Sequence, residues 1–136
     1  KYHPGGSLGK RLFLKVEDVI NSKALPKVDT SDLMKDVIIE ISNKMLGIAV
    51  VMEKNTIIGV ITDGDLRRQL LKSQDISKIK AHEIMSKNPK IISKNILATE
   101  ALSIMKTNKI SQLIVAEKNK YVGVLHIQSL IKEGIV

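Results

Sequence analysis

Apolar residues recur along the chain with two alternating periods. Between residues 34 and 41 they fall at i, i+3, i+4 and i+7, which is the spacing of one face of an amphipathic helix. Apolar runs then cover Ile48–Met52 and Ile57–Ile61, and a polar turn separates them, as in a β-hairpin. Asp65–Leu71 follows as a second, shorter helix. The order helix, hairpin, helix predicts a unit of the α/β class.

The same order of elements returns about 64 residues later. The second helix has an apolar face made of Ala98, Ala101, Leu102 and Met105. Leu113–Ala116 and Tyr121–Leu125 form the second hairpin, and both hairpin turns contain Glu-Lys-Asn. A copy of about 60 residues buries its apolar faces poorly alone. We therefore expect the two copies to pack around a pseudo-twofold axis, with a cleft between them.

The polar stretch 72–80 joins the two copies, and residues 1–15 form a separate lead-in. We divide the chain into a linker (1–15), a first repeat with its connecting segment (16–80) and a second repeat (81–136). Because the chain starts without methionine inside a glycine-rich phrase, we expect a longer protein with a further N-terminal domain.

Composition restricts the classes of partner. The net charge is +8, but nearly all the basic residues are scattered lysines, with arginine only at positions 11, 67 and 68. One Phe, two Tyr and no Trp give nucleic-acid bases no aromatic platform on which to stack. Cysteine is absent, which excludes disulfides and thiolate metal sites. The apolar runs are far shorter than the roughly 20 residues that span a bilayer. We expect a cytoplasmic protein that binds neither nucleic acid nor membranes.

The end of the first hairpin, where a strand feeds a helix, is the candidate ligand-binding site. Helix starts offer free N–H groups and a positive dipole end to phosphate. Thr62 adds a hydroxyl, and Asp65 is placed to accept two hydrogen bonds from a ribose diol. Arginine holds phosphate or carboxylate in bidentate fashion. The candidate residues are Thr62, Asp63, Asp65, Arg67 and Arg68.

A purely structural interpretation of this phrase stays open, because Thr62 and Asp65 also have the spacing of a helix capping box. In the second repeat, His126 and Ser129 replace this pair, so we expect unequal sites and a structural role for the histidine. The repeats contain no nucleophilic triad, paired acid and base, or metal-ligand cluster. We expect no catalysis by this chain alone, no metal and no required cofactor.

Residues 59–65 (GVITDGD) resemble the signature of the CBS domain pair, or Bateman module, which is Gly, two apolar residues, Thr or Ser, two variable residues and Asp. The resemblance implies two α/β repeats, each a small sheet packed with two helices. It also implies that adenosine or another nucleotide binds in the cleft, and that pairs self-associate into a flat disc.

Three strings, residues 3–11 (HPGGSLGKR), 62–68 (TDGDLRR) and 123–126 (GVLH), are similar to the D-arabinose 5-phosphate isomerase family. Such enzymes carry an N-terminal sugar isomerase (SIS) domain and interconvert ribulose 5-phosphate and arabinose 5-phosphate for the lipopolysaccharide sugar Kdo. The resemblance implies that His3 serves the active site of the longer enzyme. Ser129 departs from the Asp that the family has at this position.

We therefore predict a regulatory and oligomerisation module that senses a nucleotide or nucleotide sugar. By resemblance, the candidate effectors are CMP-Kdo and an adenine nucleotide. The alternative is a purely structural oligomerisation module without a physiological ligand.

Overall fold

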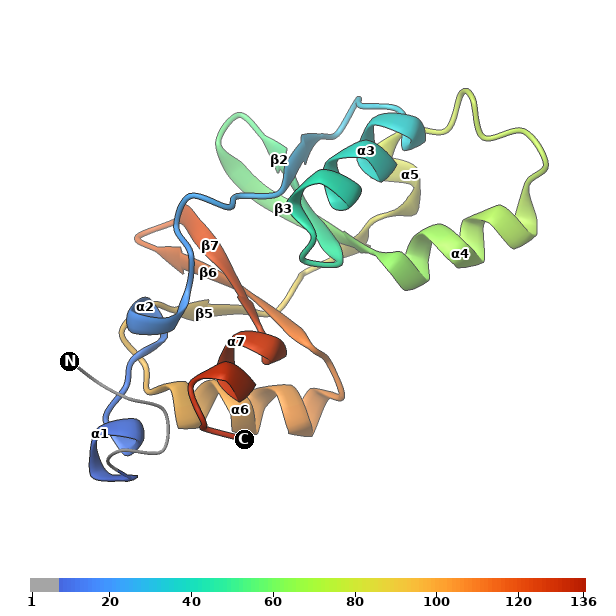
Figure 1. The fold of residues 1–136 in the computed structure, drawn as a ribbon. Coiled ribbons are helices and arrows are strands. Elements are labelled where there is room, and N and C mark those ends of the chain that lie inside the picture. Colours follow the sequence, from blue (N-terminus) through green and yellow to red (C-terminus); the bar gives the residue numbers. More distant parts are fainter. Residues whose placement is uncertain (1–7) are drawn as a thin grey trace. The chain divides into compact units, whose positions relative to one another are not determined.

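The computed structural model describes residues 8–136, and these form two compact units (Figure 1). The first unit is Ala24–Pro89, and the second joins the described residues up to Lys23 with Lys90–Val136. Each unit has its own sheet and its own buried core. The described part of the chain therefore begins in the second unit, forms the first unit and then returns to the second.

The sheet of the first unit has four strands in the order β1-β2-β3-β4. They are β1 (Lys27–Asp29), β2 (Ile48–Glu53), β3 (Thr56–Thr62) and β4 (Ser86–Lys87). β1 is parallel to β2, and the other pairs are antiparallel. The hairpin turn puts Lys54 and Asn55 at φ values of 48° and 67°, which suits a type I′ turn. Because Ile48 pairs with Thr62, the start of β2 lies beside the end of β3.

Three helices accompany this sheet, and the longest, α3, confirms the predicted apolar face. They are α3 (Met34–Lys44), α4 (Asp63–Lys72) and α5 (Ala81–Ile84). Met34, Val37 and Ile41 of α3 are buried in one cluster with residues of β2 and β3. Burial of each such side chain contributes roughly 1.5–3 kcal/mol. The core thus fixes the hairpin whose last residue, Thr62, directly precedes α4.

The second unit repeats this plan with a three-stranded sheet in the order β5-β6-β7. Its strands are β5 (Ile91–Ser93), β6 (Gln112–Glu117) and β7 (Lys120–His126), and its helices are α1 (Leu8–Leu12), α2 (Val16–Val19), α6 (Ala98–Asn108) and α7 (Ile127–Lys132). Figure 1 shows α6 and α7 against this sheet. None of the helices in the described part of the chain is long and apolar enough to cross a membrane.

The short helices α2 and α5 are exchanged between the sequence repeats. Val16 of α2 is fully buried in the core of the second unit, and its N–H donates to the carbonyl of Ile96 (2.9 Å). In the same way, Ala81 of α5 is fully buried in the core of the first unit, and its N–H donates to the carbonyl of Asp32 (2.8 Å). Each unit is therefore completed by the short helix that precedes the other repeat's hairpin in the sequence.

Candidate ligand-binding site

Thr62 ends β3 and is the N-cap residue of α4. Its hydroxyl accepts a hydrogen bond from the N–H of Asp65 (3.2 Å), and the Asp65 carboxylate accepts one from the N–H of Thr62 through Oδ2 (2.9 Å). These two bonds form a complete capping box, which satisfies two backbone donors at the start of the helix. The α4 helix begins at Asp63, two residues earlier than the sequence predicted, because the box includes the whole first turn.

The second carboxylate oxygen of Asp65 holds an arginine. Oδ1 lies 2.6 Å from Nη2 of Arg68, one turn further along α4. The Asp65 side chain is only 12% exposed, whereas the Arg68 side chain is 68% exposed. The carboxylate is thus fixed by the fold, and the guanidinium is free to move into solvent.

A hollow of about 180 Å³ adjoins this ion pair. It lies in the first unit and is lined by Asp65, Arg68, Gln69, Lys72, Glu83 and Ile84. Ligand pockets for whole drug-sized molecules start near 300 Å³, so this hollow suits one group of a ligand. Its lining combines two carboxylates, Asp65 and Glu83, with two cationic side chains one helical turn apart, Arg68 and Lys72. Cationic side chains of this kind can hold a phosphate or carboxylate group.

The five predicted residues do not all converge. Thr62, Asp65 and Arg68 form one continuous hydrogen-bonded group. Arg67 is exposed and lies outside the residues that line the hollow. Asp63 is exposed as well, and its backbone N–H donates to the carbonyl of Gly47 (3.2 Å), which ties the helix start to the beginning of β2.

Three polar residues of the hollow were missed by sequence reasoning. Lys72 and Gln69 follow Arg68 and Asp65 at i+4, so the helical period of α4 is a signal that would have found them. Glu83 comes from α5, and no local pattern connects it with α4. Its Oε1 accepts a hydrogen bond from the N–H of Lys80 (2.9 Å), so it is also a helix-capping group.

The second unit has a different cap at the equivalent place. Nδ1 of His126 accepts a hydrogen bond from the N–H of Gln128 (3.0 Å) at the start of α7. Burial lowers the pKa of His126 from its ordinary value, which favours the neutral ring. As the acceptor of this bond, Nδ1 belongs to the tautomer with its proton on Nε2. Ser129 stands where the first unit has its carboxylate. The two helix starts are therefore chemically unequal.

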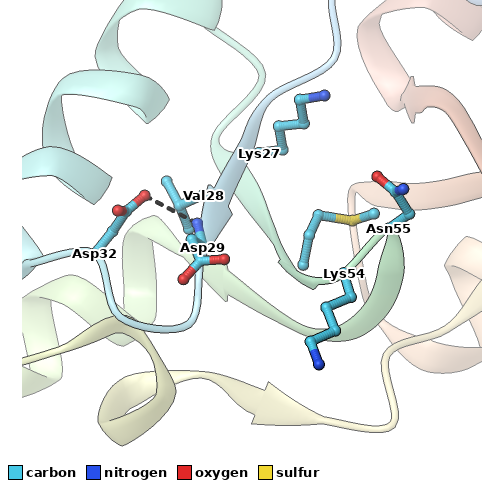
Figure 2. Close-up of a pocket in the computed structure, with 7 residues that line it drawn as sticks. Lys27, Val28, Asp29, Asp32, Lys54 and Asn55 are labelled. Carbon is cyan, nitrogen blue, oxygen red and sulfur yellow. Dashed lines mark hydrogen bonds between the residues drawn. The ribbon is translucent and has the colours of Figure 1, made fainter.

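A larger hollow of about 370 Å³ lies at the other end of the first hairpin (Figure 2). Its two carboxylates are engaged locally: Asp29 accepts from the N–H and hydroxyl of Ser31 (3.0 and 2.7 Å), and Asp32 accepts from the N–H of Asp29 (2.9 Å). The Ser31 hydrogen bonds lower the pKa of Asp29. The Lys27 and Lys54 amines point to opposite sides. These charges do not converge on one ligand group.

His3 lies outside the described residues. Within residues 8–136, no group of three His, Cys, Asp or Glu side chains is placed to hold a metal ion.

Comparison with known proteins extends these observations. The family model of the CBS domain matches residues 16–72 and 81–135. A curated relative, arabinose 5-phosphate isomerase KdsD of Pseudomonas aeruginosa, is 39% identical over 98% of this chain, and the match covers 42% of that protein. The chain thus spans less than half the length of this relative. The predicted resemblance to both families is confirmed.

Solved structures show the same fold. A CBS domain protein from Pyrobaculum aerophilum complexed with AMP has a TM-score of 0.77 at 18% identity, covering 85% of this chain and 89% of that one. CBSX2 in complex with AMP has a TM-score of 0.73 at 22% identity, covering 87% and 93%. These likenesses confirm the predicted α/β class, with two small sheets and their helices.

Proposed function

The chain belongs to the CBS domain family, and from this premise we propose that it is the regulatory pair of a longer arabinose 5-phosphate isomerase. Its proposed task is to bind a nucleotide or nucleotide sugar at Thr62 and Asp65. The observation that carries the proposal is the nearly buried Asp65 carboxylate, held beside the Thr62 hydroxyl and next to two cationic side chains. Two solved relatives of the same fold are complexes with AMP, which supports a nucleotide as the ligand class.

The hydrogen-bonded group of Thr62, Asp65 and Arg68 offers the kinds of contact that a nucleotide requires. Each carboxylate oxygen of Asp65 has a second lone pair, so the cap leaves capacity to accept from a ribose or sugar diol. Arg68 and Lys72 supply positive charge for phosphate or carboxylate. Asp63 and Arg67 are proposed as outer residues that adjust the local charge. The proposed effectors are CMP-Kdo and, as the general case, an adenine nucleotide.

Catalysis is proposed only for a longer protein that contains this chain. The relative named arabinose 5-phosphate isomerase is more than twice as long as this chain. We propose that its additional length corresponds to a sugar isomerase (SIS) domain, and that His3 acts there in proton transfer or substrate positioning. On this basis the CBS pair regulates the interconversion of ribulose 5-phosphate and arabinose 5-phosphate for Kdo synthesis.

A purely structural module is the second candidate, and one observation favours it. Both carboxylate oxygens of Asp65 already have protein partners, so α4 starts correctly without a ligand. Leu70 and Leu71 near the end of α4 are 52% and 88% exposed, and under this candidate a second copy of the chain covers them. Self-association is common to both candidates, and sedimentation equilibrium measures it directly.

Ligand-induced stabilisation separates the two candidates. We would measure the melting temperature of the chain with AMP, ATP, CMP and CMP-Kdo, because a ligand at 100 times its Kd adds about 2.7 kcal/mol. Asp65→Ala is expected to lower the melting temperature and to abolish the ligand shift. A wild-type protein that none of the four compounds stabilises is a structural module.

Asp36→Ala is the matched control. Asp36 caps α3 in the same way, accepting from the N–H of Leu33 (3.2 Å), and no ligand is proposed there. Both substitutions should cost about 0.5–2 kcal/mol as lost caps. Only Asp65→Ala should remove the ligand shift; equal loss in both variants would assign the effect to general destabilisation.

A further inference from the structure

The Arg68 guanidinium folds back over the first turn of α4. A Cβ atom at Gly64 would lie 3.3 Å from Nη1 and 3.5 Å from Nη2 of Arg68. It would also lie 3.6 Å from the Thr62 hydroxyl oxygen. The glycine therefore leaves space in which the guanidinium reaches Asp65 beside the capping hydroxyl. Arg68 covers the part of the helix start where the ligand is proposed to bind.

The two oxygens of Asp65 have separate partners. Oδ2 belongs to the cap and faces the N–H of Thr62, whereas Oδ1 faces Arg68. A diol that approaches Asp65 meets Oδ1 already paired with a guanidinium. The ligand must therefore share this oxygen with Arg68 or displace it.

Displacement of Arg68 is easy on energetic grounds. The Arg68 side chain is 68% exposed, although that of Asp65 is only 12% exposed. Ion pairs at exposed positions change an equilibrium by roughly fivefold at most. In its position beside Asp65, Arg68 lines the hollow together with Lys72. Glu83 also lines it, with its Oε1 held by the N–H of Lys80, so Arg68 and Lys72 share the hollow with the two carboxylates of Asp65 and Glu83.

We infer that Arg68 makes the site selective for phosphorylated ligands by exchanging partners. In the free protein it neutralises Asp65 and competes with the diol of any ligand. When the ligand carries a phosphate, Arg68 transfers to that group and Asp65 is released to the diol. A ligand without phosphate has to displace Arg68 and offers it no new partner. The inference rests on the proposed function and adds the group that the site selects.

Affinities of matched ligands with and without phosphate test this exchange. We would titrate the intact chain by calorimetry with adenosine and AMP, and with cytidine and CMP. Arg68→Gln should weaken binding of the nucleotide about tenfold or more, because a charge-assisted hydrogen bond is lost. The same substitution should strengthen binding of the nucleoside by roughly two- to fivefold, because Oδ1 of Asp65 is then free.

Arg67→Gln is the matched control, because it removes the same charge from the neighbouring exposed position. Arg67 has no hydrogen bond to Asp65 among the described contacts, so Arg67→Gln should weaken nucleotide binding less than Arg68→Gln does and should not strengthen nucleoside binding. The inference is overturned if the wild type binds these compounds but Arg68→Gln changes the ratio of nucleotide to nucleoside affinity no more than Arg67→Gln does. Binding of none of the four compounds by the wild type overturns the proposed nucleoside-type ligand, and the inference with it.

Discussion

Carboxylates at the third position of a helix are a general folding device in this chain. Asp18, Asp36, Glu83 and Glu100 each accept a hydrogen bond from the backbone N–H at their own N-cap, as Asp65 does. At these four helix starts the N-cap residue is Lys or Leu and offers no side-chain acceptor. Thr62 does offer one. The hydroxyl and the Arg68 ion pair, rather than the carboxylate alone, therefore distinguish the candidate site.

His126 makes the stability of the second unit dependent on pH. Its pKa lies below the ordinary value of 6.5 because burial penalises the charged ring. The unfolded chain therefore takes up the proton at a higher pH than the folded protein does. The free energy of unfolding should be undiminished above about pH 6.5 and should fall as the pH drops below it. The expected loss is small, because the side chain is only half-buried and solvent screens part of the effect.

Urea unfolding at about pH 7.5 and pH 5.5 measures this effect. His126→Thr is the control, since it supplies the cap that Thr62 provides in the first unit and removes the titrating ring. The difference between the two pH values should shrink in this variant. An unchanged difference would assign the pH dependence to other groups.

At the scale of elements, Gly59 shows why a glycine stands in the middle of β3. A Cβ atom there would lie 2.6 Å from Sδ of Met85 and 2.9 Å from the carbonyl oxygen of Ser86. Ser86 belongs to β4, which pairs with β3 at this point. We expect Gly59→Ala to lower the free energy of unfolding by about 1–3 kcal/mol, because the methyl group pushes β4 away.

Gly123 is the equivalent glycine of β7 and provides the comparison. A Cβ atom at this position would lie 3.2 Å from Cδ1 of Ile20, which is the end of a side chain and can shift. Gly123→Ala should therefore cost less than Gly59→Ala in urea unfolding. Equal costs would mean that the contact with β4 does not determine the role of Gly59.

The long elements were predictable, and the short ones were not. α3 and both hairpins have enough residues to show a period, so the pattern of apolar positions located them. β1, β4 and β5 have only two or three residues, too few for any period to be recognised. The ion pair of Asp65 with Arg68 follows from helical spacing. The hollow beside it is also lined by α5, and the contact of α5 with α4 depends on tertiary packing, so the sequence pattern could not predict the hollow.

At the scale of the whole molecule, the exchange of short helices connects the fold with the candidate site. The hollow beside Asp65 is completed by Glu83 and Ile84 of α5. The repeat pattern assigned α5 to the second repeat, because its sequence precedes that repeat's hairpin. In space α5 belongs to the first unit, where Ala81 is part of the core. The first unit and its hollow therefore depend on residues beyond position 80.

Two fragments of nearly equal length test this dependence. The fragment 24–89 contains the complete first unit with α5, whereas 16–80 lacks α5 and contains α2 without the core in which Val16 is buried. Units of about 60 residues are marginally stable, so loss of one core element should be decisive. We expect 24–89 to give dispersed amide resonances and a cooperative urea transition, and 16–80 to remain largely unfolded. If 16–80 is as stable as 24–89, the exchanged helix contributes nothing essential, and the sequence repeat itself is the folding unit.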